Sequence, residues 1–95
     1  MRRFLLLGAV LLLAAGCTES RQRAAARAVE RHASGQARCT KSARMLGGTP
    51  VETTVFICNV KRSDALCDRY RSTLTRQGFH VKLEARGVDC VLPPT

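Results

Sequence analysis

The chain has 95 residues, a formal net charge of +9, five cysteines, no tryptophan, one tyrosine and three phenylalanines. A chain of this length forms at most one small domain, which excludes a multidomain enzyme. The low aromatic content excludes a large core, so the domain is expected to need staples such as disulfides. A hydrophobic content of 45% excludes a wholly disordered chain.

The first sixteen residues are typical of an export signal. Met1, Arg2 and Arg3 form a short positive segment, and residues 4–15 carry no charged or polar side chain. A helix needs about 20 apolar residues to cross a bilayer. This run is shorter, and it matches the apolar region of a signal peptide. Small residues then lead directly into Cys17.

The segment from Leu13 to Cys17 (Leu-Ala-Ala-Gly-Cys) resembles the lipobox of bacterial lipoproteins, with Ala14 where the family most often has leucine. The resemblance implies that residues 1–16 are removed and that the Cys17 thiol receives a diacylglyceryl group, with a further acyl chain such as palmitate commonly on its amine. Because each buried CH₂ contributes about 0.8 kcal/mol, two or three chains anchor a protein firmly in membrane lipid.

The resemblance also implies a location in the cell envelope. Thr18 follows the cysteine, where an aspartate often retains Gram-negative lipoproteins in the inner membrane. Its absence favours the periplasmic face of the outer membrane. The alternative is an ordinary signal peptide, an unlipidated Cys17 and a secreted soluble module such as an inhibitor or small effector.

Residues 17–37 are expected to form a tether between the anchor and the domain. Alanine and arginine dominate this stretch and favour a helix, but Val29 is its only large apolar residue. Without an apolar stripe to pack, the segment is expected to be a solvated helix that acts as a spacer, or an unstructured leader. Ser34 and Gly35 are expected to end it.

Residues 38–95 are expected to form a small α+β domain. Thr53–Val60 is β-branched and aromatic, which predicts a strand. The loop signal at residues 47–50 predicts a hairpin between this strand and residues 39–45. The next element is expected to be a helix over residues 63–77, with Ser63 as its N-cap. Its apolar face would hold the residues Leu66, Cys67, Tyr70 and Leu74.

A second strand is predicted after this helix. Apolar and polar residues alternate over residues 79–86, which is typical of a strand with one wet face. Gly87 is predicted to be a turn or bulge, because the apolar phase shifts beyond it and allows a short last strand over 88–92. The expected fold is a disulfide-stapled antiparallel sheet with one packed helix, in the order β-β-α-β.

Four cysteines remain once Cys17 is assigned to lipid: Cys39, Cys58, Cys67 and Cys90. An even number in an exported chain predicts two disulfides. Of the three possible pairings, a hairpin centred on residues 48 and 49 favours Cys39 with Cys58, which leaves Cys67 for Cys90. The spacings lack the short C-x₂₋₄-C pairs of a zinc site and the C-x-x-C of a redox site, so no metal or cofactor is expected.

No catalytic constellation stands out, and a non-enzymatic protein is expected. His32 lies in the expected tether and His80 on the wet face of a predicted strand. No nucleophile motif, phosphate-binding loop or metalloprotease motif is present. The carboxylates show no paired spacing that acid–base catalysis would require.

The basic residues of the domain predict an anionic partner. They are Lys61, Arg62, Arg69, Arg71, Arg76, Lys82 and Arg86. Export and the scarcity of aromatic residues argue against nucleic acid. An acidic envelope protein or an anionic lipid surface is the better counterpart, and a merely solvated basic face is the remaining interpretation. The sequence therefore predicts a lipid-anchored envelope protein that binds another envelope component.

Overall fold

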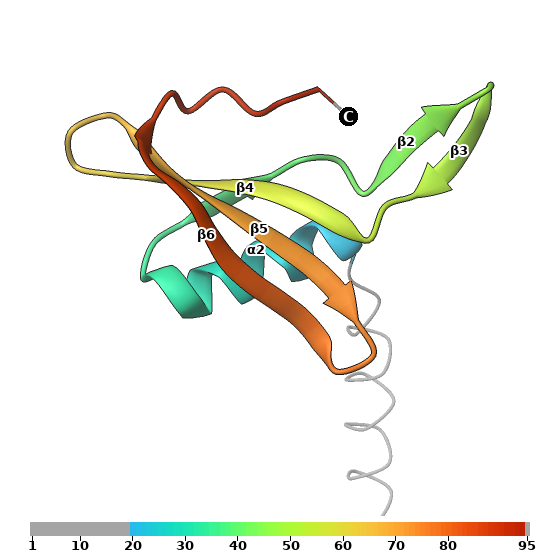
Figure 1. Cartoon of the computed structure of the whole chain (residues 1–95), viewed down its shortest axis with the longest axis horizontal. Coiled ribbons are helices and arrows are strands. Elements are labelled where there is room, and N and C mark those ends of the chain that lie inside the picture. The colour runs from blue at the N-terminus through green and yellow to red at the C-terminus, as the bar shows by residue number, and fades with distance from the viewer. Residues whose placement is uncertain (1–19, 95) are drawn as a thin grey trace, which may run out of the picture.

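The computed structural model describes residues 20–94. They form a four-stranded antiparallel sheet in the order β1-β4-β5-β6, a two-stranded hairpin, β2-β3, and the helix α2 across one face of the larger sheet (Figure 1). The bounds are α2 Arg21–Ala33, β1 Ala37–Cys39, β2 Ala43–Leu46, β3 Thr49–Glu52, β4 Val55–Lys61, β5 Cys67–Thr75 and β6 Gly78–Val88. The expected α+β class is confirmed.

Helix α2 occupies the part of the chain that was expected to be a tether. Its N-cap is Ser20, whose Oγ accepts a hydrogen bond from the Arg23 N–H at 3.2 Å. Ala25 and Val29 are fully buried against the sheet. The expectation of a solvated or unstructured segment at 17–37 is therefore wrong from residue 21 onward. Small alanines at helical spacing let the helix approach the sheet closely, so a stripe of large residues is not needed.

Strand β5 occupies the segment that was expected to be a helix. Tyr70 and Ser72 are buried on the side of α2 and Leu74 is half-buried, whereas the residues between them belong to the other face. Ser72 is fully buried, and its Oγ donates a hydrogen bond to the Ala25 carbonyl oxygen at 3.5 Å. The helix expected over 63–77 is therefore wrong, because a polar residue in a core position concealed the two-residue period of the strand.

The first hairpin is longer and more irregular than expected. Cys39 lies opposite Cys58, the register that a hairpin centred on residues 48 and 49 requires. Beyond this pair the arm divides into β1 and β2, and β2 pairs with β3 in a register displaced by two residues, with Leu46 opposite Thr49. The strand expected at Thr53–Val60 is observed at Val55–Lys61.

Strand β6 agrees with its predicted pattern. Exposed and half-buried residues alternate along it from Gly78 to Arg86. Gly87 has a φ of 62°, and two register shifts against β5 lie close to it, so the predicted bulge is confirmed. Residues 89–94 form no strand, and the short last strand is therefore wrong.

The core lies between α2 and the sheet. Phe56 of β4 is fully buried and meets Phe79 of β6 edge to face, with ring centroids 6.0 Å apart. The disulfide between Cys39 and Cys58 lies in the same cluster. One face of the sheet is thus covered by the helix. The other face, called the open face below, carries polar and charged side chains.

Candidate functional site

Two disulfides close the domain. Cys39 bonds Cys58 between β1 and β4, and Cys67 bonds Cys90 between the start of β5 and the C-terminal segment. This is the pairing that the hairpin geometry favoured. All four sulfurs are oxidised, and no group of three potential metal ligands lies within residues 20–94. Cys17, the expected lipidation site, lies outside the described residues.

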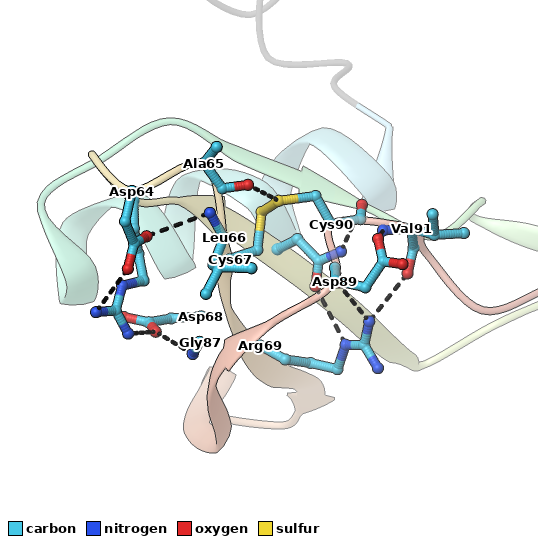
Figure 2. The surroundings of a disulfide bond; sticks show 12 residues. Asp64, Ala65, Leu66, Cys67, Asp68, Arg69, Gly87, Asp89, Cys90 and Val91 are labelled. Carbon is cyan, nitrogen blue, oxygen red and sulfur yellow. Dashed lines mark hydrogen bonds and ion pairs between the residues drawn. A yellow bond between two sulfur atoms is a disulfide. The ribbon is translucent and has the colours of Figure 1, made fainter.

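The C-terminal segment, residues 89–94, is held over the open face by polar contacts. Arg69 Nη2 donates to the carbonyl oxygens of Asp89 and Val91 at 3.2 and 2.9 Å, and Figure 2 shows its guanidinium pointing toward these residues. Asn59, which is buried, accepts from Arg69 Nε at 3.2 Å and donates to the Cys90 carbonyl oxygen at 2.9 Å. Arg69 therefore acts as a structural clamp.

The seven basic residues expected to form one surface are distributed over several elements. Arg62 pairs with Asp64 at 3.2 Å and with Asp68 at 3.4 Å, and Arg71 pairs with Glu84. With Arg69 engaged by backbone oxygens, three of the seven are committed within the fold. The remaining four are the exposed residues Lys61, Arg76, Lys82 and Arg86. Among these, Lys82 and Arg86 belong to β6, Arg76 to the β5–β6 turn and Lys61 to the end of β4.

A cationic groove follows β1, at the edge of the sheet. One hollow of about 630 Å³ lies between α2 and β1, and a second of about 560 Å³ lies between β1 and the C-terminal segment. Gln36, Arg38 and Leu92 line both hollows. Arg23 lines the first and Lys61 the second, and both side chains are exposed. We call this region the β1-edge groove.

The electrostatics of the β1-edge groove favour an anion. Glu30 is the acidic residue of the first hollow, and its Oε2 accepts a hydrogen bond from the Ala37 N–H at 2.9 Å. That carboxylate thus holds the chain between α2 and β1. The exposed cations Arg23 and Arg38 line the first hollow, and Arg38 and Lys61 line the second, so an acidic side chain or an anionic headgroup can approach positive charge in both.

Sequence reasoning missed most of this groove. Arg23 was assigned to a tether outside the domain, and Arg38 was not included among the basic residues of the expected surface. A signal for Arg38 was present in the sequence. Arg38 lies between Ala37 and Cys39 on a strand. Because these two neighbours point inward, Arg38 points outward, and it lies across from Asn59.

The two histidines have ordinary surroundings. His32 lies on α2 and meets the Tyr70 ring edge to face at 5.9 Å, and His80 is exposed on β6 as expected. Neither lies in the β1-edge groove. The groove is lined by cations, by several amide side chains and by neutral groups that include Leu92 and the Cys67–Cys90 disulfide. Its exposed cations are suited to holding an anionic surface in place.

Comparisons with known proteins identify no relative. No protein family model, no curated protein and no solved structure matches this chain. Within residues 20–94, the helix is too short and too polar to cross a bilayer.

Proposed function

We propose that this chain is a lipid-anchored bacterial envelope protein, without enzymatic activity, that presents a small basic domain to another envelope component. The proposal is supported by the order of features along the chain. A lipobox-like segment ends at Cys17, and a folded domain closed by two disulfides begins at Ser20. Disulfides persist in oxidising compartments such as the periplasm, which agrees with export.

The fold changes the expected geometry of the anchored protein. Because α2 packs into the core, only three residue steps separate Cys17 from the N-cap Ser20. An extended chain spans at most about 3.6 Å per residue, so the domain would lie within about 11 Å of the anchored cysteine. We therefore propose that the domain is held directly at the bilayer surface, where it faces partners that are themselves close to the membrane.

Metabolic labelling with a palmitate analogue tests the anchor. The wild-type protein should be labelled, and Cys17→Ser should not. The matched control is the double variant Cys67→Ala/Cys90→Ala, which also removes cysteines but should retain the label. Label that persists in Cys17→Ser would contradict the proposal, and an unlabelled wild type would favour the alternative of a secreted soluble module, which the alanine at position 14 leaves open.

Crosslinking in intact envelopes tests the binding role. Arg38→Glu/Lys61→Glu reverses two charges in the β1-edge groove, and Arg76→Glu/Arg86→Glu makes the same change of net charge elsewhere. Loss of the crosslinked partner in the groove variant and its retention in the control would support an anionic partner at β1. Equal loss in both variants would indicate attraction by net charge alone.

A further inference from the structure

The β2–β3 hairpin projects from the body of the domain (Figure 1). Both of its strands are exposed along their whole length, and among residues 20–94 they pair only with each other. Three of its large hydrophobic side chains are exposed: Met45 at 67%, Leu46 at 62% and Val51 at 37%. None of them contributes to the hydrophobic core. The hairpin therefore carries apolar surface that the fold itself does not use.

The end of this hairpin is apolar on both sides. Met45 lies opposite Pro50, and Leu46 lies opposite Thr49. Since successive strand residues point to opposite faces, Met45 and Pro50 share one face while Leu46 and Val51 belong to the other. A flat protein surface would cover only one of these faces. A medium that surrounds the tip, such as the acyl-chain boundary of a bilayer, would cover both.

The charge pattern of the hairpin agrees with a membrane surface. The Met45–Pro50 and Leu46–Thr49 pairs at the tip carry no charge, Arg44 lies one pair behind them opposite Val51, and Lys41 precedes the hairpin. The one acid of the hairpin, Glu52, lies at its base and pairs with Arg21. The turn at the tip, Gly47-Gly48, has positive φ values of 58° and 83°, which keeps it tight and free of side chains. An apolar end with cations behind it is the pattern of an interfacial element on anionic lipid.

The hairpin lies at the end of the domain at which α2 begins. Arg21, the first residue of α2, pairs through Nη2 with Glu52 Oε2 at 3.0 Å, and its Nη1 donates to the Thr53 carbonyl oxygen at 3.4 Å. These contacts join the start of α2 to the base of the hairpin. The hairpin arms of four residues extend about 13 Å, and the three steps back to Cys17 extend up to about 11 Å. The tip and the acyl chains can therefore reach the same bilayer.

We propose that the tip of the β2–β3 hairpin inserts into the headgroup and acyl-chain boundary of the membrane that holds Cys17, as a second attachment that fixes the orientation of the domain. This inference rests on the proposed lipid anchor. Unpaired backbone groups on the two hairpin edges limit insertion to the interfacial region, because hydrocarbon cannot satisfy them. In this orientation the hairpin and the acyl chains together restrict rotation of the domain about its short N-terminal linker.

The test uses the full lipidated protein, purified from membranes and reconstituted into vesicles containing anionic phosphatidylglycerol. Met45→Cys and the control Ser63→Cys are each labelled, without reduction, with an environment-sensitive fluorophore. Ser63 is exposed in the β4–β5 loop, which lies at the opposite side of the molecule in Figure 1. Intact mass before labelling verifies that both disulfides are retained. Vesicle flotation reports the anchor, and quenching by nitroxide-bearing lipid reports the depth of each label.

If the tip inserts, lipid nitroxide should lower the fluorescence emission at position 45 by roughly two-fold or more, because interfacial elements bury their apolar face about 5–10 Å into this boundary. The emission at position 63 should be nearly unchanged. Ala43→Cys, nearer the base, should show an intermediate effect. Flotation without quenching at position 45 would overturn the insertion and leave the anchor intact. Failure to float would overturn the anchor and the insertion with it. An unquenched label that crosslinks to a protein in intact envelopes would replace the bilayer with a protein partner.

Discussion

Val29→Ala tests whether α2 belongs to the folded domain or to a solvated tether. The side chain of Val29 is fully buried between the helix and the sheet. Its truncation removes two carbon groups at about 0.8 kcal/mol each, and the remaining cavity adds to this cost. Alanine regains about 0.5 kcal/mol of helix propensity. The net expectation is a loss of about 1.5 kcal/mol in the free energy of unfolding.

A buried Val29 and a Val29 on a solvated helix predict changes of opposite sign in the stability of Val29→Ala. In a solvated helix, alanine would be neutral or slightly stabilising, since only the propensity changes. The assay is urea and thermal unfolding of the oxidised protein, followed by circular dichroism. For a domain of this size, 1.5 kcal/mol corresponds to a decrease in Tm of about 6–12 °C. Arg23→Ala, at an exposed position of the same helix, should change stability by less than about 0.5 kcal/mol. An unchanged or raised Tm for Val29→Ala would refute the packing of α2.

Three further variants examine other contacts. In Gly35→Ala the new Cβ would lie 2.8 Å from a β4 valine methyl, so we expect a loss of about 1–3 kcal/mol in urea unfolding, and a neutral result would exclude this close approach. Arg69→Met removes the clamp on residues 89–94, and amide exchange there should become at least about ten-fold faster, since hydrogen bonds to a charged group contribute about 1.5–3 kcal/mol. Cys39→Ala/Cys58→Ala opens a loop with a sequence separation of 19 residues, which lowers the free energy of unfolding by about 3 kcal/mol. A loss below about 1 kcal/mol would show that this disulfide contributes little.

The parts of the fold that were predictable from sequence follow from local patterns. Alternation along residues 79–86 predicted β6, and the apolar phase shift predicted the bulge at Gly87. Hairpin symmetry about residues 48 and 49 predicted that Cys39 lies opposite Cys58. Each of these inferences uses the two-residue period of a strand or the geometry of a turn, which neighbouring residues determine largely by themselves.

The parts that failed depend on tertiary context. Residues 63–77 fit a helical face through Leu66, Cys67, Tyr70 and Leu74, but Tyr70 and Leu74 also fit one face of a strand once Ser72 between them is counted as buried. Only the contact of its hydroxyl with α2 explains that burial, and the position of α2 was itself not predicted. A helix was one of the two expectations for this segment, but its packing against the sheet was missed. Its buried face consists mainly of alanine, which composition does not separate from a solvated helix.

The same reasoning explains which part of the candidate site was found. The basic residues of β4, β5 and β6 were identified from charge alone, but their partners decide which of them face solvent. Arg62 pairs with Asp68 and Arg71 pairs with Glu84, and these acids lie close to the two arginines only once the strands have paired. The β1-edge groove depends on the packing of α2, so Arg23 and Arg38 could not be grouped before the helix was placed.

The mass of the mature N-terminal peptide tests the central proposal most directly. The protein is extracted from membranes with detergent, digested, and the peptide beginning at residue 17 is measured. A lipid anchor predicts that the protein partitions into the detergent phase and that its first peptide begins with Cys17 and carries the added mass of two or three acyl chains. An unmodified Cys17 at the start of a mature protein in the aqueous phase, or an uncleaved precursor, would contradict the lipid anchor.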